Sequence, residues 1–163
     1  MKARTLVALA AGLMVVGGCG IASEVDALKK MPTKGDAFTH ALHMEYAALA
    51  GAADGRGADD SAEMYYNKGK MAAAGKKVDP LNMKERKLPK GVAEEIEAAR
   101  WVLVAVLKGG GPKKSPNQTA MAQAMFDCWM DEAAKEKPSA KEVKACRDGF
   151  DAAYNRANDA VNQ

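Results

Sequence analysis

The residues best able to ligate a metal ion or to do covalent chemistry are few in this chain of 163 residues, which has two histidines and three cysteines. His40 and His43 are three residues apart, so on a helix they would share one face, with Glu45 nearby. That is half of a zinc site at most, because a structural site needs four ligands. No Ser-His-Asp or paired-carboxylate arrangement stands out. We therefore expect surface histidines, no metal, no cofactor and no enzymatic activity.

Cys19 ends a segment that reads as a targeting signal. Lys2 and Arg4 form a positive start, and the eleven residues from Leu6 to Val16 are apolar. This run is shorter than the ~20 apolar residues of a membrane-spanning helix and is typical of a signal peptide. Val16-Gly17-Gly18-Cys19 resembles the bacterial lipobox. The resemblance implies that residues 1–18 are cleaved off and that the Cys19 thiol receives a diacylglycerol; the alternative is a secretory peptide with an incidental cysteine.

Lipidation would fix the topology of the mature chain. One acyl chain binds a membrane only marginally, whereas two or three anchor a protein stably. We expect residues 19–35 to be the lipidated cysteine and a tether, at most partly helical, and residues 36–163 to be a periplasm-facing α-helical domain. Gly20 stands where an Asp retains enteric lipoproteins in the inner membrane. This favours the outer membrane over the inner membrane or the cell surface.

Cys128 and Cys146 are expected to form a disulfide, because an exported domain folds in an oxidising compartment. They lie about nine residues before and about eight residues after a turn near Lys137-Pro138, nearly level in an antiparallel helical hairpin. A redox or metal role is the alternative. It is less favoured, because the sequence has no C-x-x-C motif and neither histidine is near these cysteines.

Start and stop signals divide the chain after residue 35 into helices. Asp36 is an N-cap residue, Asp59 or Asp60 starts a second helix, and Gly75 ends it. The apolar positions of the first helix are Phe38, Leu42, Tyr46 and Leu49, and residues three or four apart in the second are Met64, Tyr65, Lys68 and Met71. The glycine-rich run 51–57 lies between them, and residues 76–90 form an irregular crossover with two prolines. The acidic residues 54–63 do not match an EF-hand loop.

Pro89 opens a third helix, whose apolar stripe is Val92, Ile96, Ala99, Leu103 and Val106. Residues 101–107 are apolar on every side, so we expect a buried central helix, with a strand as the rival. Residues 109–112 then stop the helix, and residues 109–114 are expected to be a solvated linker and not a phosphate-binding loop, because they lack the G-K-[ST] ending.

Two capping boxes, at residues 115–118 and 139–142, start the fourth and fifth helices. The apolar face of the fourth helix carries Met121, Met125, Cys128 and Trp129, and that of the fifth helix carries Val143, Cys146, Phe150 and Tyr154. No stretch alternates with a period of two, as a half-buried strand would. The sequence predicts an all-α fold, a four- to five-helix bundle with a disulfide-stapled C-terminal hairpin. The alternative is a helical-repeat-like superhelix.

Residues 121–129 (MAQAMFDCW) and 145–150 (ACRDGF) are similar to segments of alphaproteobacterial OmpA-like outer-membrane lipoproteins. The similarity extends over roughly residues 36–155 and covers the helical N-terminal region of that family. It implies an envelope location, lipidation and a helical module. The family's peptidoglycan-binding domain would follow this region and has no counterpart in this sequence, so peptidoglycan binding is not carried over.

The net charge and the residue types limit the functions that this chain can have. The full sequence has 24 Lys and Arg residues and 21 Asp and Glu residues, and removal of Lys2 and Arg4 would leave 22 basic and 21 acidic residues. This small positive charge does not indicate binding to nucleic acid. Trp101, Met121, Met125 and Trp129 are either core or an adaptable partner groove, since methionine repacks around varied partners. Asp127 and Asp148 are expected to form exposed pairs with Lys or with Arg147. We predict a lipid-anchored, non-enzymatic structural or protein-interaction module with an envelope partner; the alternative is a periplasmic small-ligand or peptide-binding module.

Overall fold

A computed structural model describes residues 21–163, and these form seven α-helices, one short 3-10 helix and no strand. The helices are α1 (Ala22–Lys30), α2 (Ala37–Asp54), α3 (Asp59–Ala73), α4 (Lys90–Lys108), α5 (Gly111–Lys114), α6 (Pro116–Ala133) and α7 (Ala140–Asn162); the 3-10 helix is η1 (Met83–Glu85). The prediction of an all-α bundle is confirmed. The predicted signal peptide and Cys19 lie outside the described residues.

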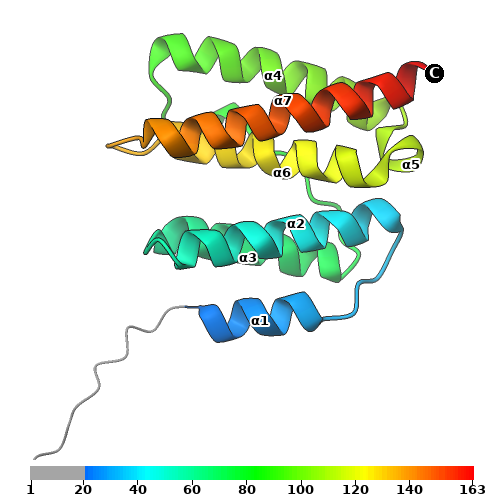
Figure 1. The fold of residues 1–163 in the computed structure, drawn as a ribbon, viewed down its shortest axis with the longest axis horizontal. Coiled ribbons are helices and arrows are strands. Elements are labelled where there is room, and N and C mark those ends of the chain that lie inside the picture. Colours follow the sequence, from blue (N-terminus) through cyan, green and yellow to red (C-terminus); the bar gives the residue numbers. More distant parts are fainter. Residues whose placement is uncertain (1–20) are drawn as a thin grey trace, which may run out of the picture.

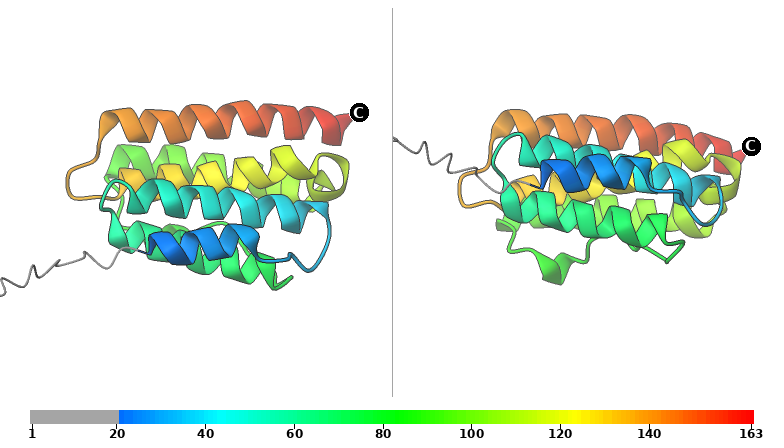
Figure 2. Two further views of the ribbon diagram at one scale, coloured as in Figure 1. Left: turned by 60° about the horizontal axis from the view of Figure 1, so that its bottom comes forward. Right: turned by 90° about the horizontal axis from the view of Figure 1, so that it is seen from below.

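The long helices run side by side in a stack of layers (Figure 1). Helix α1 forms one outer layer, α2 and α3 lie above it, α6 comes next, and α4 and α7 form the opposite outer layer. The two turned views show that α2 and α3, and likewise α6 and α7, form antiparallel pairs, with the α6–α7 loop and the α2–α3 turn at one end (Figure 2). Helix α6 therefore occupies the centre of the bundle, where it contacts α2, α4 and α7.

The core has two main parts, which meet at α6. One lies between α4, α6 and α7, and its largest buried side chains are Ile96, Leu103, Phe126, Trp129 and Phe150. The other lies between α1, α2, α3 and α6 and includes Val25, Leu42, Tyr46 and Tyr65. Leu49 and Met64 are partly buried and pack against both parts. The apolar stripes predicted for the first, third and fifth helices supply most of these residues.

Several predicted helix ends are confirmed. The Asp36 carboxylate accepts a hydrogen bond from the Thr39 backbone N–H at 2.9 Å, so it caps α2. Gly75, at a φ of 73°, follows the end of α3, and the N–H groups of Gly75 and Lys76 bond back to the carbonyls of Ala72 and Met71. The cap at Ser139 is present, since its hydroxyl accepts from Glu142 N–H at 3.4 Å.

The capping box predicted at residues 115–118 is wrong, although α6 begins at Pro116 as expected. The Ser115 side chain makes no cap hydrogen bond, and the buried Oε1 atom of Gln118 has no hydrogen-bond partner among residues 21–163. The short helix α5 directly precedes Ser115, and the backbone ψ of Ser115 is 66°. The two residues that do cap a helix, Asp36 and Ser139, have an extended backbone. The expected solvated linker is likewise a packed helical turn, in which Gly111 is buried.

Residues 19–35 are predicted to be a tether, at most partly helical; the structure places helix α1 within them and packs it into the domain. Val25 and Leu28 are only 2% and 1% exposed, because they pack against α2 and α3. Leu28 fits over Gly69 of α3, where a Cβ atom would lie 2.8 Å from Leu28 Cδ2. The close approach of α1 to α3 therefore depends on a residue without a side chain at position 69.

The third predicted helix forms, but it is not the buried central helix. Helix α4 lies in an outer layer, and Trp101 is 78% exposed. Trp101 is on the opposite side of α4 from the buried residues Ile96, Ala99, Leu103 and Val106, as the 3.6-residue repeat requires. The apolar stripe predicted for this helix does not include Trp101 and is consistent with its exposure. The prediction of full burial came from the apolar character of residues 101–107.

Candidate functional site

A row of buried carboxylates on α6 is the main polar feature of the fold. Asp127 is 0% exposed, and Asp131 and Glu132 are also buried. Asp127 and Asp131 are four residues apart, so both lie on one face of α6. That face is directed at α2, α3 and the crossover between α3 and α4, which supply their partners.

Asp127 receives hydrogen bonds from three separate segments. Tyr46 of α2 donates to Oδ2 at 2.6 Å, Lys68 of α3 donates to the same oxygen, and the Leu81 N–H of the crossover donates to Oδ1 at 2.7 Å. Burial raises the pKa of Asp127, and the positive charge of Lys68 opposes that rise. One turn earlier, Gln123 extends the network by donating to the Val78 carbonyl at 2.8 Å.

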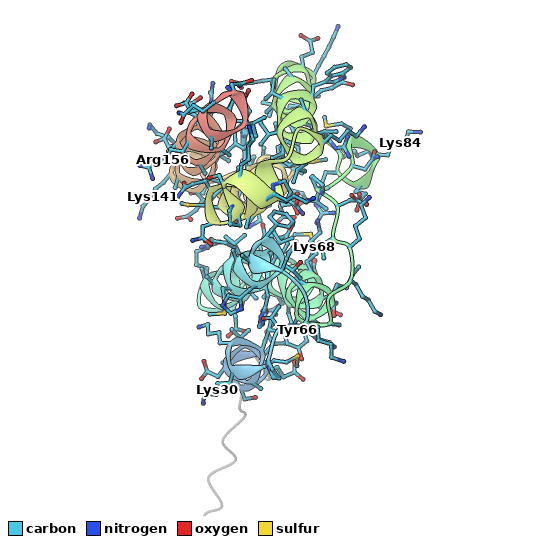
Figure 3. The ribbon with its side chains drawn as sticks, turned by 90° about the vertical axis from the view of Figure 1, so that its right-hand side faces the viewer. Lys30, Tyr66, Lys68, Lys84, Lys141 and Arg156 are labelled. Atoms are coloured by element: carbon cyan, nitrogen blue, oxygen red, sulfur yellow. A yellow bond between two sulfur atoms is a disulfide. The ribbon has the colours of Figure 1, made fainter. Side chains whose placement is uncertain are left out.

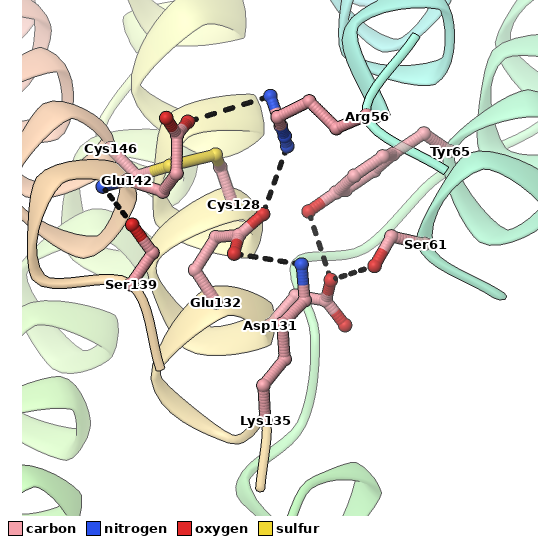
Figure 4. The surroundings of a disulfide bond; sticks show 10 residues. All are labelled: Arg56, Ser61, Tyr65, Cys128, Asp131, Glu132, Lys135, Ser139, Glu142 and Cys146. Atoms are coloured by element: carbon pink, nitrogen blue, oxygen red, sulfur yellow. Dashed lines mark hydrogen bonds and ion pairs between the residues drawn. A yellow bond between two sulfur atoms is a disulfide. The ribbon is translucent and has the colours of Figure 1, made fainter. Parts of the chain in front are cut away.

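Asp131 joins α6 to the start of α3. Ser61 donates to Oδ2 at 2.6 Å, and Arg86 of the crossover donates to Oδ1 at 2.9 Å (Figure 4 draws the Ser61 bond). The Tyr65 hydroxyl lies 3.4 Å from Oδ2. Burial, together with the nearby carboxylates, raises the pKa of Tyr65, so this phenol stays protonated.

Glu132 connects α6 to the loops at the same end of the bundle. Its two oxygens accept from Arg56 at 3.0 Å and from Lys135 at 2.7 Å. Arg56 also lies 3.4 Å from Glu142, next to the disulfide (Figure 4). Buried charges are tolerated where they are paired and hydrogen-bonded, and all three carboxylates meet that condition. The row therefore positions α2, α3 and the crossover against α6.

Three surface hollows are relevant to binding, and the first two adjoin this framework. One of about 690 Å³ lies at the start of α3 and is lined by residues including Ser61, Arg86 and Asp131. A second, of about 630 Å³, lies between α2, the crossover and α4. A third, of about 390 Å³, lies beside Trp101. The second and third hollows share Arg100, Val104 and Lys108, so these three residues of α4 line both of them.

The predicted disulfide is confirmed. Cys128 of α6 and Cys146 of α7 are bonded, with a Cα–Cα distance of 5.5 Å (Figure 4). Both cysteines are buried in the core between α4, α6 and α7. The turn at residues 134–139 brings the two helices back antiparallel, as the spacing around Lys137-Pro138 predicted.

The four residues of the predicted partner groove do not come together. Trp129 is 3% exposed and packs against Phe150, with ring centroids 6.0 Å apart, while Arg147 lies over its indole ring. Met121 and Met125 pack against the same core. Trp101 faces solvent on α4, and its hollow contains none of the other three. Trp101 alone remains as a partner-binding candidate.

The structure places His43 differently from the sequence prediction. His43 is 1% exposed, with Nε2 at 2.8 Å from the Leu28 carbonyl and Nδ1 at 2.7 Å from the Thr33 hydroxyl. His40 is exposed and contacts the same hydroxyl at 3.0 Å. His43 is thus a core residue that holds α1 to α2. Within residues 21–163, no group of three or more His, Cys, Asp or Glu side chains is arranged to hold a metal ion.

The predicted exposed pairs are half right. Asp148 forms an exposed pair with Lys144, but Arg147 pairs with Glu95 of α4. Asp127 is not exposed at all, because α6 is enclosed on its α2 side as well as on its α7 side. The signal that could have found the buried row is the spacing of Gln123, Asp127 and Asp131 at every fourth residue.

No protein-family model, curated protein or solved structure matches this chain. Among the described helices, none is both long and apolar enough to cross a membrane.

Proposed function

We propose that this protein is a lipid-anchored lipoprotein of the cell envelope, in the outer membrane and facing the periplasm, that acts as a non-enzymatic protein-interaction module. The lipobox-like segment that ends at Cys19 supports the anchor. The buried Cys128–Cys146 disulfide fits an exported domain, since such bonds persist in oxidising compartments. The buried carboxylate row fits a framework, because its oxygens are bonded to the protein itself.

The observation that carries the interaction role is the exposure of Trp101. Its side chain is 78% exposed on a well-formed helix and borders a hollow of about 390 Å³. Tryptophan is enriched among the residues that dominate binding energy at protein interfaces. Val102 beside it is also partly exposed, at 39%. A partner side chain that enters this hollow would cover Trp101 and stack on its indole ring.

The mechanism of such a module is confinement. A lipid on Cys19 holds the domain within a thin layer at the membrane, which raises its effective concentration against neighbouring envelope proteins. A modest contact at Trp101 is then sufficient, because the anchor has already restricted the search to the membrane surface.

Two variants test the proposal in membranes of the producing cell. Cys19→Ser should abolish lipid labelling and release the domain from the membrane fraction. Trp101→Ala should keep the membrane location but lose its crosslinks to an envelope protein, whereas the matched variant Met44→Ala, at a residue 39% exposed on α2, should keep them. Unchanged labelling of the Cys19→Ser variant, or crosslinks that persist without Trp101, would contradict the proposal.

The second candidate function, a periplasmic ligand-binding module, is favoured by the hollow between α2, the crossover and α4. This hollow, of about 630 Å³, lies in the size range of small-molecule pockets and is lined by side chains including Phe38, Leu42, Leu107 and Arg100. Protein extracted from membranes and analysed by native mass spectrometry distinguishes the two. A stoichiometric small molecule, lost in a Leu107→Arg variant, would favour ligand binding over protein interaction.

A further inference from the structure

The folded domain begins only two residues after the predicted lipid attachment site. The Ile21 N–H donates to the Asp54 carboxylate at 3.0 Å, and the Ile21 carbonyl accepts from Val25 N–H at 2.9 Å. Ile21 is therefore fixed to both α1 and the end of α2. Two residues span at most about 7 Å, so a lipid on Cys19 keeps this corner of the bundle at the membrane surface.

From this we propose that α1 lies along the membrane surface and that its outward face contacts the lipid headgroups. The inference rests on the proposed lipidation of Cys19. Helix α1 is itself an outer layer, so no other part of the described domain lies between it and the membrane in this orientation (Figure 1). Helix α4, which carries Trp101, is then in the layer farthest from the lipid and faces the periplasm.

The outward face of α1 is opposite to its buried side. Val25 and Leu28 define the buried side, and the 100° step per residue places Ser23, Ala27 and Lys30 opposite to them. These three residues are exposed. Figure 3 shows Lys30 directed away from the bundle, at the extreme of the molecule formed by α1. The face is small and polar, which suits contact with headgroups without insertion into the acyl chains.

The charges at the two ends of α1 favour this orientation over one in which the α2–α3 turn contacts the membrane and the helices point away from it. That turn, at the same end as Ile21, carries Asp54, Asp59 and Asp60, which anionic lipids repel. Glu24 and Asp26 are also exposed near the Ile21 end of α1, whereas Lys29, Lys30 and Lys34 are exposed at its other end. Anionic headgroups attract this basic group, so the end of α1 that is farther from Cys19 is drawn to the membrane surface.

Quenching of tryptophan fluorescence by brominated lipids tests the orientation. The full lipidated chain carrying Ala27→Trp and Trp101→Phe is placed in vesicles of phosphatidylethanolamine and phosphatidylglycerol, brominated near the headgroups. The tryptophan introduced by A27W should lose most of its emission relative to unbrominated vesicles. The parent chain is the matched control, since Trp101 is on the layer farthest from the lipid and Trp129 is buried in the core, so both should keep their emission. Quenching of the parent but not of A27W would overturn the proposal.

Two further variants distinguish the effect of the short link between Cys19 and Ile21 from the effect of the lysine charges on the quenching. Inserting about twelve Gly and Ser residues between Gly20 and Ile21 adds a mean span of about 20 Å and should restore most of the A27W emission. K29E/K30E/K34E should reduce quenching in anionic vesicles, with no change in pure phosphatidylcholine. Quenching that neither change reduces would overturn the orientation.

The failure of lipidation and the failure of this inference give different results. Lipid labelling and flotation with vesicles are measured first, on the same preparations. Absence of both contradicts the proposed function itself. Lipidated, floating protein whose A27W tryptophan is not quenched contradicts only the orientation of α1. Melting curves of each variant check that the exposed substitutions leave the bundle folded.

Discussion

Tyr46 on α2 donates its hydroxyl hydrogen to Asp127 on α6 across 2.6 Å, and neither side chain is exposed to solvent. These residues are 81 positions apart in the sequence. The bond joins the α1–α3 part of the bundle to the α4–α7 part, and the disulfide does not, because both cysteines belong to the second part. The joint between the two parts is therefore polar and non-covalent at its centre.

The first prediction concerns this joint. Asp127→Ala leaves Tyr46, Lys68 and the Leu81 N–H without their common acceptor, so we expect the free energy of unfolding to fall by about 3–5 kcal/mol. Urea denaturation followed by circular dichroism measures the change. Asp148→Ala is the matched control: its pair with Lys144 is exposed, and its loss should change stability by about 0–1 kcal/mol. Equal losses in the two variants would refute a special role of the buried row.

The second prediction concerns the disulfide. The bond closes a loop between residues 18 positions apart, so removing it with C128A/C146A should lower the free energy of unfolding by about 2–4 kcal/mol. Reduction of the parent chain should give a similar loss. Membrane location and partner crosslinks should survive at temperatures where the variant stays folded. A variant as stable as the parent that has lost its crosslinks would show that the cysteines have a chemical role.

The two tryptophans should behave in opposite ways. Trp129→Ala removes a buried ring from the α4–α6–α7 core and should destabilise the protein by about 3–5 kcal/mol. Trp101→Ala removes an exposed ring and should change stability by less than about 0.5 kcal/mol. Thermal and urea unfolding of both variants provide the comparison. A large loss of stability in Trp101→Ala would mean that this ring supports the fold rather than a partner.

The fourth prediction is a pH dependence at the start of α2. Hydrogen bonds from Thr39 lower the pKa of Asp36 below its ordinary value of 3.8. Its ionised form therefore contributes stability above that value, and the contribution is lost as the pH falls through the lowered pKa. Asp36→Ala should cost about 1 kcal/mol at neutral pH and less in acid. Asp36→Asn keeps a cap that does not titrate, so its stability relative to Asp36→Ala should stay constant with pH.

Local patterns predicted the parts of the fold that depend on neighbouring residues. The N-cap at Asp36, the left-handed glycine at position 75 and the level cysteines all follow from short-range geometry, and the structure contains each of them. The order of the layers does not follow from such patterns. Residues 101–107 of α4 are apolar on every side and suggested the central helix, yet α6 is central, with Asp127 at its middle.

The buried row escaped prediction because the partners of Asp127 and Asp131 are distant in the sequence. Ser61 and Arg86 lie 70 and 45 positions from Asp131. An acidic residue on a helix is normally exposed, and only a cation brought to it by the tertiary fold makes its burial tolerable. His43 escaped for the same reason, since its partner on α1 belongs to a segment that resembled a tether.

If Cys19 carries the proposed lipid, Gly69 sets how far the domain can reach from the membrane. Leu28 occupies the space that a side chain at position 69 would need, so a large residue there would displace α1 from α3. The chain from Cys19 to Asp36 would then be a leash that spans up to about 60 Å when extended. With glycine in place, a lipidated chain keeps the bundle next to the membrane, with α1 nearest the lipid. In the proposed location, the size of one side chain would therefore select between a domain held at the membrane and one able to reach across the periplasm.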